Sequence, residues 1–292
     1  MERAMLVDAH HHFWDPSRAS YPWLTDELAA IRRPFGPEDL RPLLQASGVA
    51  WTILVQTRSS IDETREFLAT AADTEFIAGV VGWVDLTAAD VADRLAELRA
   101  AKGGAKLVGI RHQVHDEPDA EWLLRRDVRQ GIAAVGHAGL AYDLLVRARE
   151  LPAALATARA FPDMRFVIDH LAKPPIRDSA IGDWSAHLEP LAALSNVFCK
   201  LSGLVTEADW QTWRVEQLVP YVRRALDWFG PARCLFGSDW PVCLLAASYA
   251  QVLDACRRAV GDVSDADRER IFGGNATGLY RLAVPAATGP RR

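Results

Sequence analysis

The hydrophobic and polar positions of the chain follow two alternating patterns along almost its whole length. Short apolar runs rich in β-branched residues, typical of buried strands, alternate with longer segments of helical periodicity, such as 60–73 and 215–230. Several helical segments begin just after Ser, Thr or Asp, the residues that favour helix N-caps. The apolar runs predict eight strands, at residues 5–10, 51–56, 76–84, 105–112, 139–146, 165–170, 197–203 and 233–239.

An alternation of eight strands with helices favours an α/β fold of the TIM type, the parallel (β/α)8 barrel. The alternative is a doubly wound sheet, which requires a glycine-rich phosphate loop after its first strand. Residues 8–16, at the end of the first predicted strand, contain no glycine. Because no linker interrupts the pattern, we predict a single domain over residues 1–282 and a flexible C-terminal tail over 283–292.

Three consecutive histidines, His10 to His12, stand at the carboxyl end of the first predicted strand. Because side chains alternate between the two faces of a strand, we expect Asp8, His10 and His12 on one face and His11 on the other. Two same-facing imidazoles have the spacing that ligands of one shared ion need. A hydrogen-bonded pair at the barrel mouth is the alternative interpretation, and for His11 we expect a structural role.

Polar residues gather at the carboxyl ends of the predicted strands, where the active sites of (β/α)8 barrels form. His170 ends the sixth predicted strand beside Asp169, and Asp239 ends the eighth. The imidazoles of His10, His12 and His170 together with the Asp239 carboxylate suit a single divalent ion, either Zn²⁺ or Mn²⁺. Asp239 could also take a proton from water as a general base, or cap the next helix.

Further side chains at these strand ends are candidates for substrate contact, with structural roles as the alternative: Gln56, Trp83, Arg111, His112, Tyr142 and Lys200. An arginine in such a position can hold a carboxylate or polarise a carbonyl group. The remaining histidines, His115, His137 and His187, fall in predicted loops or helices, and we expect no functional role for them.

The composition is that of a soluble globular protein, with 292 residues, 50% of them hydrophobic, and a formal net charge of −5. No basic block is present, which argues against nucleic acid as a partner. Four widely spaced cysteines predict buried, reduced thiols. No signal peptide is recognisable and no apolar run approaches the ~18 residues of a membrane span, so we expect no membrane association and a cytoplasmic location.

Several motifs occur in an order that resembles one family. These are "VDAHHHFWDP" with "YPWL", then "GIRH", "VIDHLAKP", "CKLSGL", "FGSDWPV" and "GGNATGLY", which together span Val7 to about Tyr280. In this combination the chain resembles the amidohydrolase superfamily. It is most similar to the amidohydrolase-related branch that contains sugar-lactone hydrolases of the L-fuconolactonase and L-rhamnonolactonase type.

The resemblance implies a distorted (β/α)8 barrel that hydrolyses a C–O bond in a small cyclic ester. It carries the metal or polar cluster of the family over to His10, His12, His170 and Asp239, and the substrate-contacting arginine to Arg111. Two-metal members have a bridging carboxylated lysine at the end of the fourth strand. Here that strand ends in Arg111-His112, which argues against a binuclear site. Some relatives act without any metal, so metal-independent action is the alternative.

Three functions are compatible with these residues. The first is a lactonase in which Asp239 activates water, while Trp23, Trp240 and two further tryptophans (Trp14 and Trp83) form an apolar wall for a sugar ring. The second is a metal-dependent decarboxylase of a small aromatic or unsaturated acid, and the third is a non-catalytic barrel that binds a small molecule. We favour the lactonase, with a small lactone as its partner, and leave a homodimer open.

Overall fold

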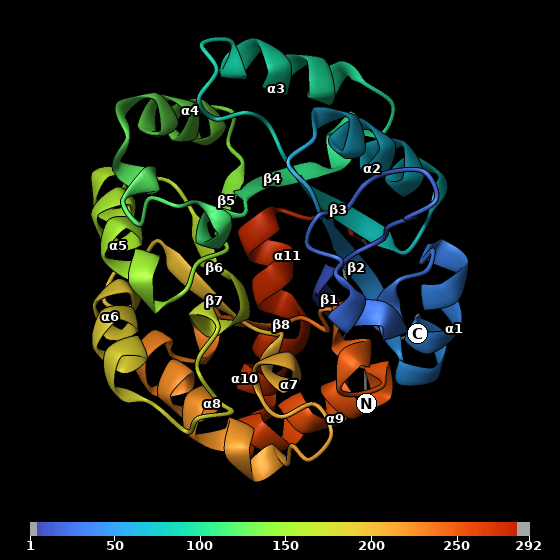
Figure 1. The fold of residues 1–292 in the computed structure, drawn as a ribbon, viewed down its shortest axis with the longest axis vertical. Coiled ribbons are helices and arrows are strands. Elements are labelled where there is room, and N and C mark those ends of the chain that lie inside the picture. Colours follow the sequence, from blue (N-terminus) through green and yellow to red (C-terminus); the bar gives the residue numbers. More distant parts are fainter. Residues whose placement is uncertain (1–4, 285–292) are drawn as a thin grey trace, which may run out of the picture.

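The strands pair in parallel and in chain order in a single eight-stranded sheet, in the computed structural model, which describes residues 5–284. All eight runs predicted from the sequence therefore form strands, and the prediction of a (β/α)8 barrel with one domain is confirmed (Figure 1). The strands are β1 (Leu6–His11), β2 (Val49–Val55), β3 (Ile77–Gly82), β4 (Leu107–His112), β5 (Ala141–Leu144), β6 (Phe166–Ile168), β7 (Val197–Leu201) and β8 (Cys234–Phe236).

Most helices lie outside the ring of strands, as the alternation of the two periods predicts (Figure 1). The helices are α1 (Pro37–Ser47), α2 (Ile61–Asp73), α3 (Val91–Ala100), α4 (Arg126–His137), α5 (Leu151–Ala160), α6 (Gly182–Ala192), α7 (Leu204–Glu207), α8 (Val215–Phe229), α9 (Tyr249–Val260), α10 (Asp265–Glu269) and α11 (Asn275–Tyr280). Short 3-10 turns connect them, of which Asp26–Ile31, Asp169–Ala172 and Val242–Leu245 lie near the site.

The last strand reaches the first through residues that follow β8 rather than through β8 itself. The Asp239 N–H donates to the His10 carbonyl at 2.8 Å, and the His12 N–H donates to the Trp240 carbonyl at 2.7 Å. These two bonds bring the carboxyl ends of β1 and β8 together. They also explain why β8 is shorter than predicted, since residues 237–239 leave the strand to form this contact.

Inside the ring, small and branched residues pack against the C-terminal helix α11. One buried cluster joins apolar side chains from seven of the strands to α11 and the residues after it: Val7, Ala9, Ile53, Val55, Val81, Val108, Ala141, Val167, Leu235, Ala276, Leu279, Tyr280 and Leu282. Figure 1 shows α11 in the middle of the ring of strands. The helix thus fills the interior, as side-chain layers do in barrels of this class.

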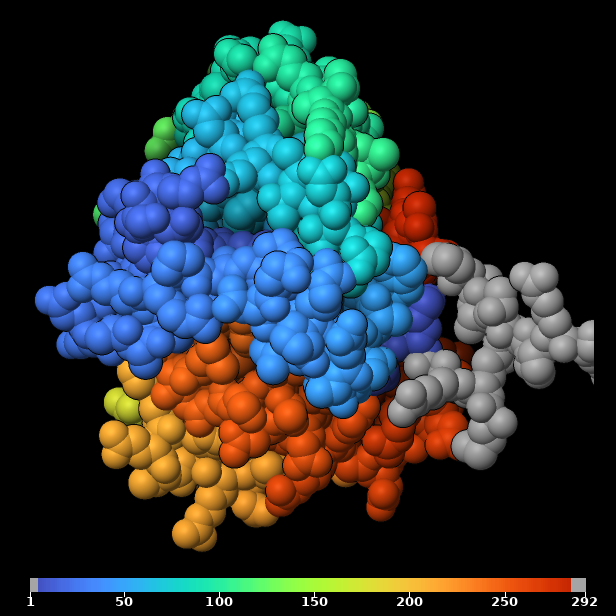
Figure 2. All heavy atoms as spheres, turned by 90° about the vertical axis from the view of Figure 1, so that its right-hand side faces the viewer, coloured from blue at the N-terminus to red at the C-terminus, as the bar shows by residue number. Residues whose placement is uncertain are grey.

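The first loop of the chain is long and folds back over the barrel. Trp14 and Phe35 pair through two backbone hydrogen bonds, of 3.2 and 2.8 Å, and both side chains are buried. Figure 2 shows these N-terminal segments, in blue, packed directly against the orange segments near the C-terminus. The loop therefore covers one side of the barrel mouth.

The structure bears on two expectations drawn from the composition, one about the cysteines and one about membrane-spanning segments. All four cysteines are free and buried there, which confirms the prediction of unpaired thiols. Within residues 5–284 no helix has the length and apolar character needed to cross a membrane. Residues 285–292 of the predicted flexible tail lie outside the described residues. The cytoplasmic location and the homodimer stay predictions.

Because α11 fills the barrel, shortening one of its buried side chains should destabilise the whole fold. We expect Leu279→Ala to lower the free energy of unfolding by about 2–5 kcal/mol, since it leaves a cavity in a closed interior. Urea denaturation measures this value. Leu155→Ala on α5, where the side chain is only partly buried, serves as the control and should cost less; equal losses would contradict the interior role of α11.

Candidate active site

A cavity of about 380 Å³ opens at the carboxyl ends of the strands, where the sequence places the candidate residues. Five of the predicted residues contribute to its lining: His12, Trp23, Arg111, His170 and Asp239. His10 lies directly behind them with no exposed surface. The loops after the strands supply the rest of the wall.

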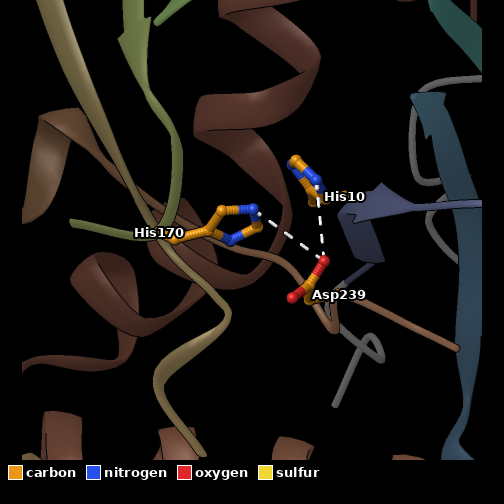
Figure 3. A group of neighbouring side chains, drawn as sticks. All are labelled: His10, His170 and Asp239. Carbon is orange, nitrogen blue, oxygen red and sulfur yellow. Dashed lines mark ion pairs between the residues drawn. The ribbon is translucent and has the colours of Figure 1, made fainter. Parts of the chain in front are cut away.

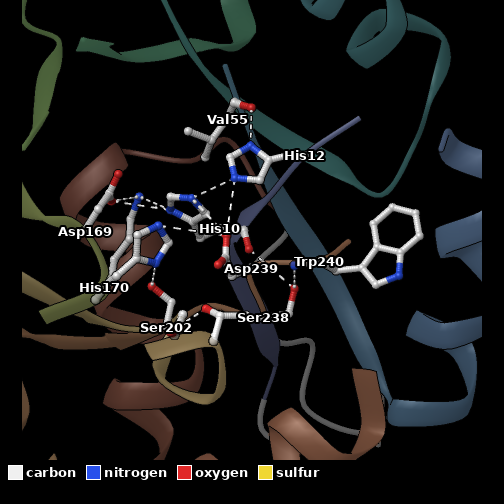
Figure 4. Close-up of polar contacts among 12 residues, drawn as sticks. His10, His12, Val55, Asp169, His170, Ser202, Ser238, Asp239 and Trp240 are labelled. Carbon is white, nitrogen blue, oxygen red and sulfur yellow. Dashed lines mark hydrogen bonds and ion pairs between the residues drawn. The ribbon is translucent and has the colours of Figure 1, made fainter. Parts of the chain in front are cut away.

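The Asp239 carboxylate is the centre of the cluster. Its Oδ1 atom lies 3.8 Å from His10 Nε2 and 3.9 Å from His170 Nε2 (Figure 3), and 3.4 Å from His12 Nε2 (Figure 4). The Nε2 atoms of His10 and His12 are 3.1 Å apart. Atoms that share one ion at bond lengths of about 2.0–2.1 Å have separations of this order.

Two of the imidazoles, those of His12 and His170, are held in orientations that suit metal binding. His12 Nδ1 donates to the Val55 carbonyl at 2.8 Å, and because a carbonyl only accepts, the Nε2 lone pair is left free (Figure 4). His170 Nδ1 is bonded to Ser202 Oγ at 2.9 Å. Such outer partners fix the ring orientation of metal-ligating histidines. His10, His170 and Asp239 form a group whose ligand atoms all lie within 4.8 Å of one another, and the donor set fits a divalent ion.

Burial keeps the histidines uncharged. Desolvation lowers the pKa of His170 to about 3 and places the pKa of His10 well below its usual value. Burial alone would raise the pKa of Asp239, but its contacts with the surrounding imidazoles, His170 foremost, outweigh it and hold the pKa below its usual value. At neutral pH His10 and His170 are therefore uncharged and Asp239 is ionised, the protonation states that a metal ion or a general base requires.

A left-handed turn places His170 in the cluster. Four consecutive non-glycine residues, His170 to Lys173, have φ values of 53°, 52°, 57° and 51°. Left-handed backbone costs such residues roughly 1–2 kcal/mol each, so the surroundings must hold the turn. Trp184 Nε1 donates to the Leu171 carbonyl at 2.6 Å, and Gly203 packs so closely that an added Cβ would lie 2.6 Å from His170 Nδ1.

Beneath the imidazoles lies a buried network of two cations and two carboxylates. Lys200 Nζ contacts Asp143 and lies 2.9 Å from Asp169 Oδ1, and Arg111 Nη1 donates to Asp169 Oδ2 at 3.0 Å. Tyr280, at the end of α11, donates to Asp143 at 2.7 Å. The formal charges balance. Burial alone would raise the pKa of Asp169. The nearby charges, of which Lys200 has the largest effect, outweigh burial and hold this pKa well below its usual range.

The two cations also bear on how many metal ions fit. Lys200 Nζ lies 3.2 Å from His10 Nδ1, and Arg111 Nη1 lies 3.3 Å from His10 Nε2. A second divalent cation on the Nδ1 side of His10 would face the Lys200 ammonium at low dielectric, where like charges repel strongly. That one ion at most binds stays a prediction.

One of the faces predicted from strand alternation is wrong. Asp8 does not join His10 and His12, because its carboxylate accepts hydrogen bonds from Tyr249 Oη on α9 at 3.0 Å and from the Ser238 N–H at 2.8 Å. The register between β1 and β2 is irregular between Asp8 and His11, so simple alternation fails there. His11 has the structural role expected for it. It is buried, and its Nε2 is bonded to Thr52 Oγ1 at 2.9 Å.

The predicted substrate contacts divide into two groups. Arg111 and Trp23 line the cavity, and Trp23 is fixed there by a 2.9 Å hydrogen bond from Nε1 to the Thr57 carbonyl. The structure does not bring the other predicted contacts to the cavity lining within residues 5–284: Gln56, Trp83, His112, Tyr142, Lys200 and Trp240.

Each residue of the second group has other partners. Gln56 Oε1 accepts from Arg111 at 2.9 Å, and Lys200 belongs to the charge network. Trp83 Nε1 donates to His112 Nδ1 at 3.0 Å, and the His112 ring stacks on Trp122. The last two are core residues, Tyr142 beside Phe166 and Trp240 beside Phe35. Polarity or aromaticity at a strand end did not distinguish a cavity wall from the layer that supports it.

Several cavity residues were missed by sequence reasoning, because they lie beyond the strand ends. They are Thr57, His115, Arg147, Lys173, Glu207 and Trp210. His115 was expected to be an ordinary loop residue. Lys173 carried the one usable signal, since it belongs to the motif "VIDHLAKP" that also supplies His170.

Fold and site together define a single-domain (β/α)8 barrel with a buried imidazole–carboxylate cluster at its carboxyl mouth. Residues 7–282 match the family described as Amidohydrolase, and the chain belongs to this family. The resemblance drawn from the motifs is thereby confirmed.

Similar proteins cover the chain almost completely. It is 42% identical to an L-fucono-1,5-lactonase of Burkholderia multivorans over 294 residues, which cover 97% of this chain and 98% of that protein. It is 44% identical to an L-fucono-1,5-lactonase of Burkholderia ambifaria over 289 residues, with coverages of 96% and 97%. A crystal structure of an amidohydrolase from Burkholderia multivorans with bound zinc superposes with a TM-score of 0.91 at 41% identity, covering 96% of this chain and all of that one.

The buried network leads to a prediction about stability. Lys200→Met removes one cation and leaves Asp143 and Asp169 undercompensated, so the free energy of unfolding should fall by about 3–5 kcal/mol at pH 7 in urea titrations. The control is Lys102→Met. Its ammonium pairs with Asp73 at the surface, where an ion pair contributes about 0–1 kcal/mol. Equal effects of the two substitutions would contradict the network.

Proposed function

We propose that the protein opens a sugar-acid lactone by attack of water on the ring carbonyl, with Asp239 as the general base. The observation that carries this proposal is the ionised Asp239 carboxylate among three buried imidazoles at the wall of the cavity. The substrate class is supported by the two Burkholderia relatives named L-fucono-1,5-lactonases, at 42% and 44% identity over nearly the whole chain.

The two oxygens of Asp239 have different surroundings. Oδ1 faces the three imidazoles, and within the described residues no hydrogen bond or ion pair involves Oδ2. Oδ2 is therefore free to accept a proton from a water molecule in the cavity. The low pKa keeps the group ionised, and it also makes the carboxylate a weak base, so the attacking water or the carbonyl needs further activation.

Arg111 supports the reaction from beside His10, where its Nη1 lies 3.3 Å from the same Nε2 atom that faces Asp239. Its guanidinium lines the cavity and is fixed by Gln56 and Asp169, so it is pre-organised to stabilise negative charge on the carbonyl oxygen. When the tetrahedral intermediate collapses, the bond between the carbonyl carbon and the ring oxygen breaks. The proton that Asp239 took from water then passes to the leaving alkoxide, which leaves the open acid and restores the carboxylate.

A single Zn²⁺ or Mn²⁺ would be held by His10, His12, His170 and Asp239. When bound, such an ion polarises a carbonyl group and lowers the pKa of coordinated water. The chain contributes the imidazole rings, the orienting contacts of His12 and His170, and the Lys200 ammonium, which repels a second ion from the Nδ1 side of His10.

The role of Asp239 is tested by Asp239→Asn, which keeps the shape and removes the basic oxygen. With a panel of aldonolactones and a pH indicator, we expect kcat on the best substrate to fall about 10²–10⁴-fold. Asp93→Asn, an exposed residue of α3, is the control and should leave the rate unchanged. A folded Asp239→Asn protein with a near wild-type rate would rule out the general-base role. Release of carbon dioxide with no lactone turnover would favour a decarboxylase.

The metal content is a separate test. Protein purified without chelator should contain no more than one equivalent of Zn²⁺ or Mn²⁺ by elemental analysis, because the cluster offers one ligand set and two cations flank it. Two tightly bound equivalents would refute the single-ion site. Full activity after stripping would show that the cluster acts through hydrogen bonds and charge alone.

A further inference from the structure

An ion pair lies inside the cavity, away from the imidazole cluster. Lys173 Nζ donates to Glu207 Oε1 at 2.7 Å, and the two side chains are 21% and 24% exposed. Both residues line the same cavity as His170 and Asp239. No step of the proposed reaction uses this ion pair.

The backbone holds both partners in fixed positions. Lys173 ends the left-handed turn that begins at His170, and its N–H donates to the His170 carbonyl at 2.8 Å. Glu207 is the last residue of α7, and its carbonyl accepts from the Arg177 N–H at 3.0 Å. The turn that orients His170 therefore also orients Lys173. The ion pair keeps a constant position relative to the reacting centre.

The pair has unused hydrogen-bonding capacity on its open side. An ammonium group has three donors and a carboxylate has about four acceptor sites. Within the described residues, Glu207 Oε1 is the only recorded partner of Lys173 Nζ, and no contact is recorded for Glu207 Oε2. A partly exposed ion pair adds little stability, so stability alone does not account for it.

We propose that Lys173 and Glu207 form a specificity subsite that recognises two neighbouring hydroxyl groups of the lactone ring. This inference rests on the proposed lactonase function. One hydroxyl donates to the Glu207 carboxylate, and its neighbour accepts from the Lys173 ammonium. A donor and an acceptor side by side match a vicinal diol, which a simple lactone lacks. The alkyl part of the ring faces Val242 and Leu245 elsewhere in the cavity.

The size of the expected effect follows from desolvation. A site built to hydrogen-bond a substrate hydroxyl discriminates against an analogue without it by up to about 10⁴–10⁵-fold, because its buried polar groups are then unpaired. Lys173 and Glu207 are partly exposed, so water can replace part of what is lost. We expect a smaller contribution, about 10²-fold, from this pair.

The experiment compares L-fucono-1,5-lactone, a polyhydroxylated substrate, with δ-valerolactone, which has the same ring and no hydroxyl groups. The proteins are wild type, Glu207→Gln, Lys173→Met and the double variant, with Lys102→Met as the surface control. We expect kcat/KM for the hydroxylated lactone to fall about 10²-fold in each single variant, and that for δ-valerolactone to change less than about threefold. The double variant should lose little more than either single one, because the two residues act as a unit.

Each other outcome has a definite meaning. An equal loss of kcat/KM on both lactones would assign the pair a structural role, and unchanged kcat/KM on both would show that it does not contact the ring; either overturns the subsite and leaves the lactonase standing. Retained turnover of δ-valerolactone also shows that a variant is folded. A wild-type protein that hydrolyses neither lactone would overturn the proposed function and the subsite together.

Discussion

Closure of the barrel between β8 and β1 is the constraint on which the site depends. The Asp239 N–H bonds to the His10 carbonyl and the His12 N–H bonds to the Trp240 carbonyl, so the contact that joins first and last strands also sets the carboxylate beside the imidazoles. Residues more than two hundred positions apart are aligned by two backbone bonds. A closed barrel has no free strand edge, which makes this alignment rigid. The same two backbone hydrogen bonds therefore close the barrel and position the carboxylate and imidazoles of the site.

The site also depends on a balance of buried charges. Neutral imidazoles persist next to Lys200 and Arg111 because burial disfavours their protonation and because Asp143 and Asp169 balance the two cations. Tyr280 connects this balance to α11, which fills the barrel. The C-terminal helix therefore supports the floor of the site as well as the core. Of the two cations in the charged network, Arg111 reaches the cavity, whereas Lys200 does not contribute to its lining.

Predictions from the sequence were correct for segments in which a single hydrophobic period, that of a strand or of a helix, continues throughout. The alternating apolar runs predicted every strand and their order, and the strand ends gave His10, His12, His170 and Asp239, which the structure brings together. It failed for properties that arise only in three dimensions. The face of Asp8 depends on an irregular register. The position of Lys200 at a strand end did not show whether its side chain would line the cavity or join the buried charge network.

The loops were the least predictable part. Glu207 lies on a short helix beyond β7, and Lys173 depends on a left-handed turn of four non-glycine residues that no propensity favours. Such turns exist only because packing, here by Trp184 and the close approach at Gly203, holds them. The residues inferred to read the substrate are thus positioned by tertiary contacts, whereas those inferred to act on the carbonyl are positioned by the barrel.

The central claim is that Asp239 activates water and does not itself attack the lactone. A single turnover in H₂¹⁸O, with enzyme in excess over lactone and the product analysed by mass spectrometry, tests it most directly. Attack by water places one ¹⁸O atom in the carboxylate of the first product molecule. A first product with no label would mean that Asp239 attacked the carbonyl carbon and formed a mixed anhydride, from which an enzyme oxygen entered the product. Label in the released hydroxyl would mean that water attacked on the alkyl side; either result would contradict the account.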